Sequence, residues 1–291
     1  MAAFAALPDP LTPGLNNLLV FYNNTNSNIN LVKRNIDEDA KNIYKDVPGT
    51  PKGAVGNPSS LTAIRWNNLV QVFGTDTDGF VVRLSPSPQY VSSDAIVSLD
   101  VTDPTSTGIA STTDGSKAWL YFFKRGTNKI TEYDLDVKNS TGLGYSPDPL
   151  SYLSATYDTD ERNRWIFFQL GQDDKDGQIQ AVNLDKNKSY IIPGSVNSKA
   201  QTPIAAVYAN KRFYVYSVNA KGRIMRSYSV VTDKGLQFTS VSTIEGLTVG
   251  SFSQLAVSAG DGFNYLFFGS KPDTTGAFPV IDYKDPHQSK D

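Results

Sequence analysis

The sequence predicts an all-β fold, a six-bladed β-propeller of four-stranded antiparallel blades. Three observations support this prediction: an aromatic strand pattern occurs six times, a strand of small residues precedes each copy, and polar turn residues follow it. No amphipathic helix pattern of comparable length competes with these strands. Because the repeats cover the chain, we expect a single propeller domain over residues 1–291, with a polar tail at residues 284–291.

The aromatic strand is the clearest repeated unit. It is expected at residues 19–22, 71–73, 119–122, 165–168, 214–216 and 265–268. Its central aromatic residue is Phe21, Phe73, Tyr121, Phe167, Tyr216 or Phe267, with spacings of 52, 48, 46, 49 and 51 residues. Aromatic and β-branched residues favour strands. Their return at this period is typical of propeller blades and is not explained by a β-sandwich or a β-solenoid.

The remaining strands of each blade follow from the flanking residues. Small-residue strands suited to the crowded innermost position are expected at residues 4–7, 61–64, 109–111, 153–155, 204–207 and 255–257. Tight hairpins that need positive φ angles are indicated by Asp78-Gly79, Thr127-Asn128, Asp176-Gly177 and Lys221-Gly222. A third strand and a variable fourth strand, such as residues 95–99 or 238–241, complete the blade. Because the sixth repeat is short, residues 280–283 are expected to pair with a segment near the N-terminus.

Composition excludes several classes of function. Lys and Arg total 27 against 29 Asp and Glu, so neither nucleic acid nor an anionic membrane surface is an expected partner. The absence of cysteine excludes thiol nucleophiles and thiolate metal sites, and the only histidine, His287, lies in the polar tail. The acidic run at residues 173–177 has Asn183 where a calcium loop needs a glutamate, so it predicts a solvated turn. No metal and no cofactor are therefore expected.

The expected location is the secretory pathway or the outside of the cell. Asn-x-Ser/Thr sequons occur at Asn23, Asn139 and Asn187, each in or beside a polar stretch, which predicts a glycoprotein. No apolar run is long enough to span a membrane, and the first residues lack the pattern of a signal peptide. We therefore expect secretion after removal of a leader.

The pattern of inner strand, aromatic strand, turn and Ile130-Thr131-Glu132 on a third strand resembles the fungal fucose-specific lectins, which are six-bladed propellers. The resemblance implies pockets between blades, each with an Arg, a Glu and a Trp. The Arg position reads Leu19, Gln71, Trp119, Trp165, Tyr214 and Tyr265 in this chain, and the Glu position reads Leu31, Arg83, Glu132, Ala181, Arg226 and Val280. No fourth strand carries a Trp. Glycan binding, if retained, is therefore expected around Glu132, with low valency.

The chain is also similar to the lectin-like fungal hetero-Diels–Alderases of tropolonic sesquiterpenoid biosynthesis, in its size, absent cysteines, sequons and lost sugar triads. This resemblance implies a cofactor-free pericyclase that joins a tropolone quinone methide to a humulene-type terpenoid alkene. Such a reaction needs an aromatic pocket and a few donors. Trp119, Trp165, Tyr214 and Tyr265 could line that pocket, or could simply fill space between the blades. Arg83 and Arg226 could bind an oxyanion, or could be solvated surface residues.

A second candidate site lies where the inner strands end, around one mouth of the central channel. Arg65 and Trp66 are the candidate catalytic pair, with Asp114, Tyr157 and Tyr208 at equivalent positions. A cation beside an indole suits a planar, electron-poor ring, although the pair could also only stabilise a blade edge. Three functions remain open: a pericyclase, a carbohydrate-binding propeller with altered specificity, and a noncatalytic interaction propeller. The expected partner is a small hydrophobic molecule or a glycan.

Overall fold

Strands dominate the fold. The computed structural model describes residues 3–10, 17–23, 28–35, 47–48, 55–56, 60–85, 89–90, 108–124, 129–145, 147–148, 150–171, 177–233, 235–251, 253–270 and 280–288. Within these residues the only helix is the single 3₁₀ turn Ser195–Asn197. The described part of the chain contains no helix that is long and apolar enough to cross a membrane.

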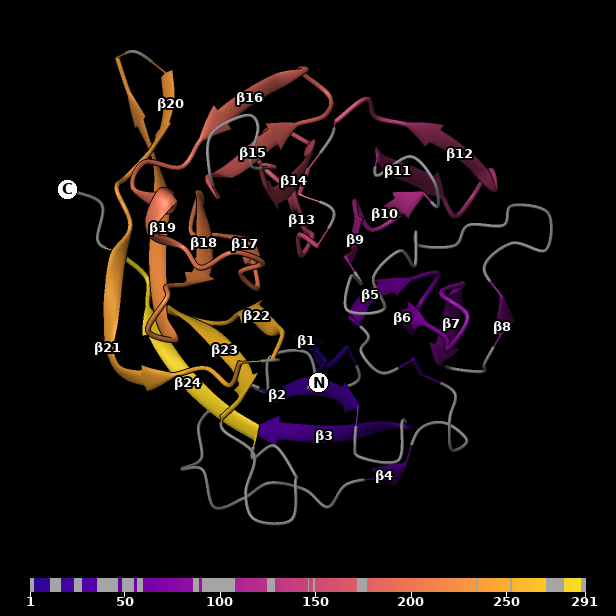
Figure 1. Cartoon of the computed structure of the whole chain (residues 1–291). Helices are drawn as coiled ribbons and strands as arrows, with labels where there is room; N and C mark the ends of the chain where they lie inside the picture. The colour runs from indigo at the N-terminus through magenta and orange to yellow at the C-terminus, as the bar shows by residue number, and fades with distance from the viewer. Residues whose placement is uncertain are drawn as a thin grey trace.

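The described residues form six antiparallel sheets, each built from consecutive strands (Figure 1). The first three are β1 (Phe4–Pro8), β2 (Asn17–Asn23), β3 (Ile29–Asn35) and β4 (Val47–Pro48); β5 (Thr62–Trp66), β6 (Leu69–Thr75), β7 (Val81–Ser85) and β8 (Gln89–Tyr90); and β9 (Ile109–Thr113), β10 (Ala118–Lys124), β11 (Lys129–Asp134) and β12 (Asn139–Gly142). The last three are β13 (Ser154–Asp158), β14 (Asn163–Gln169), β15 (Ile179–Asn183) and β16 (Lys188–Ile191); β17 (Ala205–Ala209), β18 (Arg212–Val218), β19 (Arg223–Thr232), β20 (Gly235–Phe238) and β21 (Ser242–Thr248); and β22 (Leu255–Ala259), β23 (Phe263–Gly269) and β24 (Val280–Pro286).

The all-β architecture and the six repeated sheets confirm the sequence prediction, but the blades are not all four-stranded. The fifth sheet has five strands, because the long β19 pairs with β20 along its second half and with β21 along its first half. The sixth sheet has three strands among the described residues. The strand predicted at residues 238–241 is displaced, since the observed strand β20 ends at Phe238 and residues 239–241 connect it to β21. The strand predicted at residues 95–99 lies outside the described residues.

The core lies between neighbouring blades. The second strand of each sheet carries the recurring aromatics, and the rings of Phe73, Tyr121, Phe167 and Tyr216 are fully buried. Each hydrophobic cluster joins side chains of successive sheets, as where Phe213 of β18 packs on Trp165 of β14 with ring centroids 4.5 Å apart. Burying one such ring contributes about 2–3 kcal/mol, so the blades hold each other by these contacts.

The predicted small-residue strands surround the axis. Each inner strand contacts the inner strands of the blades on either side, in the closed order β1, β5, β9, β13, β17, β22 and back to β1. They enclose a central cavity of about 100 Å³, lined by residues such as Ala5, Thr62, Ala110, Ser154 and Ala205. Three of the predicted hairpin glycines, Gly79, Gly177 and Gly222, have the positive φ angles that tight turns need, whereas Thr127-Asn128 lies outside the described residues.

The predicted strand pairing of residues 280–283 with the N-terminal segment does not form, although Val280 and Asp282 bridge the sixth and first blades by side-chain contacts. β24 pairs with β23, its own blade neighbour. Gln254 instead links blades: its Oε1 accepts from the backbone N–H of Phe4 at 3.0 Å and of Leu61 at 2.9 Å, and its Nε2 donates to the Leu61 carbonyl at 2.9 Å. An Arg34–Asp282 ion pair adds a contact between the first and sixth blades.

The segment expected to be a polar tail from residue 284 continues the last strand. β24 runs to Pro286, and Asp285 is almost fully buried. The imidazole of His287 then stacks on Tyr214, with ring centroids 5.4 Å apart, and the Gln288 N–H donates to the Tyr214 hydroxyl at 3.1 Å. These residues therefore belong to the interface between the fifth and sixth blades.

Candidate functional site

Strand register identifies the equivalent positions in each blade. The position expected for Glu lies opposite the central aromatic: Glu132 faces Tyr121 across β10 and β11, and Arg226 faces Tyr216 across β18 and β19. In the sixth blade Asp282, and not Val280, lies opposite Phe267. The prediction at Val280 was therefore wrong by two residues. Because side chains on a strand alternate with a period of two residues, Val280 and Asp282 lie on the same face of β24.

Arg164 is a residue of this candidate site that the sequence comparison missed. It lies on β14, one residue before the expected Arg position, and its side chain points back toward the third blade. Its Nη1 donates to both carboxylate oxygens of Glu132 at 2.8 Å. Its Nε and Nη2 donate to Asp185 Oδ1 at 3.1 and 2.7 Å. Strand alternation could have located it, because neighbouring residues on a strand face opposite blades.

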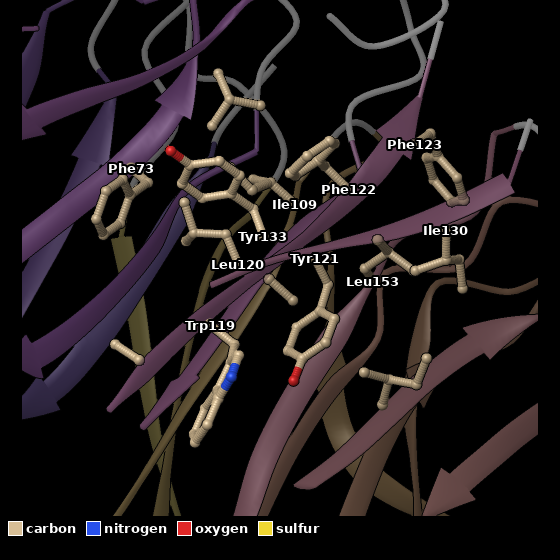
Figure 2. Close-up of a cluster of buried hydrophobic side chains, with 14 of the residues drawn as sticks. Phe73, Ile109, Trp119, Leu120, Tyr121, Phe122, Phe123, Ile130, Tyr133 and Leu153 are labelled. Carbon is tan, nitrogen blue, oxygen red and sulfur yellow. The ribbon is translucent and has the colours of Figure 1, made fainter. Parts of the chain in front are cut away.

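Aromatic residues of β10 form one wall of this site. The guanidinium carbon of Arg164 lies 4.8 Å from the Trp119 ring centroid, a cation–π contact across the blade interface. Trp119 and Tyr121 point to the same side of β10, away from Leu120 and Phe122 (Figure 2). The Tyr121 hydroxyl is buried and, within the described part of the chain, makes no hydrogen bond of normal distance and angle. We call Trp119, Tyr121, Glu132, Arg164 and Asp185 the 3/4 cluster.

The electrostatics of the 3/4 cluster follow from its carboxylates. Burial raises the pKa of the Tyr121 hydroxyl well above its ordinary value, and the charge of Glu132 adds to this. Burial would lower the pKa of Arg164, but hydrogen bonding to Asp185 and the charge of Glu132 outweigh it and raise that pKa. Arg164 is therefore a permanent cation held between two carboxylates.

The predicted channel mouth is adjacent to the 3/4 cluster. Tyr157, at the end of β13, has a pKa raised first by burial and then by the charges of Asp114 and Asp185, so it lies between the two regions. Arg65 is exposed, while Trp66 is partly buried and donates its Nε1–H to the Ser116 carbonyl at 3.2 Å. A catalytic role for Arg65 and Trp66 stays a prediction.

Tyr208 of that mouth and Trp165 of the predicted pocket lie together at the next interface. The Tyr208 hydroxyl donates to Asp160 Oδ2 at 3.0 Å. Trp165, which is 2% exposed, stacks on Tyr190 at 5.6 Å between ring centroids and packs on Phe213 with Tyr208 nearby. Its indole N–H has no hydrogen-bond partner among the described residues.

The other predicted binding residues are also packed into blade interfaces. Tyr214 is fully buried against His287, and Tyr265 is 5% exposed in the cluster between the sixth and first blades. Arg226 Nη1 lies 2.5 Å from Asp285, whose other oxygen accepts from Tyr216 at 2.6 Å. Arg83 is partly buried opposite Phe73. Ligand binding by any of these four residues stays a prediction.

No group of three or more His, Cys, Asp or Glu side chains that could hold a metal occurs among the described residues. The acidic residues 173–176 lie outside those residues. The only histidine, His287, bonds through Nε2 to Asn264 Oδ1 at 3.0 Å, and burial lowers its pKa. The site that the geometry singles out is therefore the 3/4 cluster, which can accept hydrogen bonds from a polar ligand beside an aromatic wall.

Comparisons with known proteins support the fold. No family model matches the chain. Two proteins named "wall-associated proteinase", from Coccidioides posadasii and Coccidioides immitis, are each 22% identical over 247 residues, which is 78% of this chain and 78% of each relative.

Among solved structures, the six-bladed fucose-binding lectin of Aleuria aurantia has a TM-score of 0.68 at 15% identity, over 98% of this chain and 96% of that one. AofleA from Arthrobotrys oligospora has a TM-score of 0.67 at 14% identity, over 99% and 87% of the two chains. The BP39L lectin from Burkholderia pseudomallei has a TM-score of 0.57 at 11% identity, over 97% and 96%. The predicted resemblance to the fucose-specific lectins is confirmed at the level of the fold.

Proposed function

We propose that this chain is a carbohydrate-binding propeller and that its ligand site is the 3/4 cluster. One observation carries the proposal: Glu132 and Arg164, from adjacent blades, lie 2.8 Å apart beside the Trp119 indole. The resemblance to the lectins implies an Arg, a Glu and a Trp in each pocket. Here those three residue types meet at one blade interface, although Arg164 comes from a neighbouring position on its strand.

The chemistry of the cluster suits a polyol. Glu132 and Asp185 keep 15% and 32% of their side-chain surface exposed, so their oxygens can accept hydrogen bonds from ligand hydroxyls. Bonds to a charged acceptor are stronger than neutral ones. Glu occurs at this strand position only in the third blade, so we expect one such site per chain and weak agglutination.

A glycan array followed by calorimetric titration tests the proposal. Glu132→Gln removes the charge of the acceptor while keeping its shape, and we expect at least a tenfold loss of affinity, about 1.4 kcal/mol. Glu245→Gln is the matched control, because Glu245 forms an exposed ion pair with Arg223 on the fifth blade. Absence of glycan binding, or equal binding by the Glu132→Gln variant, would overturn the proposal.

A pericyclase is the second candidate, and the interface between the fourth and fifth blades favours it. There Ala181 takes the Glu position, and Trp165, Tyr190, Tyr208 and Phe213 form an aromatic cluster with an unpaired indole N–H. Aromatic walls could hold a tropolone quinone methide against a humulene-type alkene, and the N–H could polarise the dienone oxygen.

This candidate has a direct test. Trp165→Phe should lower turnover of the two reactants, and its melting temperature has to be measured as well, because the indole is buried in the blade interface. Arg65→Ala would lower turnover only if the channel mouth holds the site. Turnover equal to wild type in both variants, or none in the wild type, would remove this function.

The relatives named as proteinases suggest a third possibility, to which the described residues give no support. The chain has no cysteine, and the side chain of its only histidine bonds to Asn264, stacks on Tyr214 and interacts with the Phe263 backbone and with the charges of Asp285 and Asp261. We keep secretion as a proposal, because Asn139 and Asn187 are exposed sequon residues.

A further inference from the structure

We propose that the 3/4 cluster prefers a sugar that carries an ammonium group, namely a 2-amino-2-deoxy sugar whose amine is not acetylated. This inference rests on the proposed carbohydrate-binding function and specifies the chemistry of its ligand. It follows from the charge of the cluster, from the hydrogen-bonding capacity left in it, and from one buried hydroxyl.

The cluster has more negative than positive charge. Glu132 and Asp185 share the single guanidinium of Arg164, so the three side chains sum to one net negative charge. Glu132 and Arg164 are partly buried, with 15% and 20% of their side-chain surface exposed, whereas Asp185 lies at the exposed rim of the cluster and keeps 32% of its side-chain surface in water. A charge in such a setting is screened less than one on the open surface, so it favours a cationic ligand.

The donors of Arg164 are nearly all used inside the protein. Its Nε, Nη1 and Nη2 donate to Glu132 and Asp185, and its backbone N–H also donates to Asp185, at 2.6 Å. A guanidinium has five N–H groups in all, so little donor capacity remains for a ligand. The carboxylates have about four acceptor sites each and keep some unfilled. The ligand must therefore supply donors, and an ammonium group supplies three.

An independent observation points to a ligand at the same place. The Tyr121 hydroxyl is fully buried, points to the side of β10 that carries Trp119 and lies near Glu132, but among the described residues it makes no hydrogen bond of normal distance and angle (Figure 2). Leaving such a group unpaired costs about 1–3 kcal/mol. A ligand hydroxyl or amine could pair with it, which would recover part of that cost on binding.

The experiment compares short oligomers of glucosamine and of N-acetylglucosamine, together with fucose, by calorimetric titration of the full chain. At about pH 6, where the amine is protonated, we expect the glucosamine oligomer to bind at least ten times more tightly than its acetylated counterpart. The preference should shrink at high salt and at about pH 9, where the amine is neutral. Glu132→Gln should reduce the preference, and Glu245→Gln should leave it unchanged.

Tyr121→Phe separates binding from folding. Because the hydroxyl makes no such hydrogen bond among the described residues of the free protein, its removal should leave the melting temperature unchanged or raise it, while the affinity for the amino sugar falls a few fold. Tighter or equal binding of fucose or the acetylated oligomer, abolished by Glu132→Gln, would overturn this inference and leave the proposed function standing. If none of the sugars bound, both would fail.

Discussion

Gln254 is expected to be a main element of ring closure, and Gln254→Ala tests this. The side chain is 5% exposed and makes three hydrogen bonds of 2.9–3.0 Å to the backbone of Phe4 and Leu61. Since β24 pairs with its own blade, these bonds are polar links, within the described part of the chain, that join the sixth blade to the first and second.

The expected cost follows from the groups left behind. Truncation leaves two N–H groups and one carbonyl without this partner, at about 1 kcal/mol of net stability each. Gln254 also lines the central cavity, so water could enter and restore part of the loss. We therefore expect the free energy of unfolding to fall by about 2–4 kcal/mol, against a typical total of about 5–15.

Equilibrium urea unfolding, followed by tryptophan fluorescence, measures this change. Gln254→Glu should also lose stability, because at this 5% exposed site its carboxylate would be desolvated and one of its oxygens would face the Leu61 carbonyl oxygen. Gln237→Ala, at an exposed position on β20, is the matched control and should change stability by less than about 0.5 kcal/mol. If Gln254→Ala were as mild as this control, the reasoning on ring closure would be refuted.

Three further predictions concern the termini, pH and modification. Deleting residues 281–291 should prevent stable folding, because it removes most of β24, whereas deleting residues 287–291 should lower the melting temperature by a few degrees. Equal melting temperatures for the 287–291 truncation and wild type would contradict the packing of His287 on Tyr214. Burial lowers the pKa of His287, so as the pH falls through about 6.5 the unfolded chain binds the proton before the folded protein does. Wild type should therefore lose stability relative to His287→Gln between about pH 7.5 and 5.5, as measured by urea titration at both pH values. A stability difference that does not depend on pH would refute this. When the protein is secreted from a eukaryotic host behind a leader, glycans should be added at the exposed Asn139 and Asn187. Asn23 should stay unmodified, because its side chain is buried and accepts from the Ala3 N–H at 2.7 Å. Intact mass before and after deglycosylation of wild type and of Asn→Gln variants measures this, and an unmodified Asn187 or a modified Asn23 would contradict the prediction.

The propeller could be predicted because its signals are local and repeated. Aromatic residues such as Tyr121 and Phe167 mark the second strand in every blade, and dipeptides such as Lys221-Gly222 fix the following hairpin. Six copies of a weak pattern add to a strong one. The outer strands were predicted poorly, because an edge strand such as β20 packs fewer side chains and so constrains its sequence less.

The site was predicted only in part, because its geometry depends on neighbouring blades. Glu132 was identified from its own strand, but its partner Arg164 lies 32 residues away on the next blade, at a position that a repeat-by-repeat comparison passes over. In the sixth blade, Val280 and Asp282 share a face of β24, and only the pairing with β23 distinguishes them. Contacts between blades and strand register are long-range properties, which one blade's sequence pattern does not specify.

The charged residues at the third-strand position show how the interface between the third and fourth blades differs from the others described. Arg226 pairs with Asp285, and Asp282 pairs with Arg34, so in each of these described pairs one cation meets one anion across a blade interface. Such pairs hold blades together and are costly to break from one side, because the remaining charge stays buried. The 3/4 cluster differs because Arg164 meets two carboxylates. One carboxylate of the 3/4 cluster therefore has no cation of its own. Replacing Asp185 with Asn should cost less stability than replacing Asp285 with Asn, because it leaves no buried charge unpaired. The Asp185→Asn variant should instead lose more affinity for a cationic ligand.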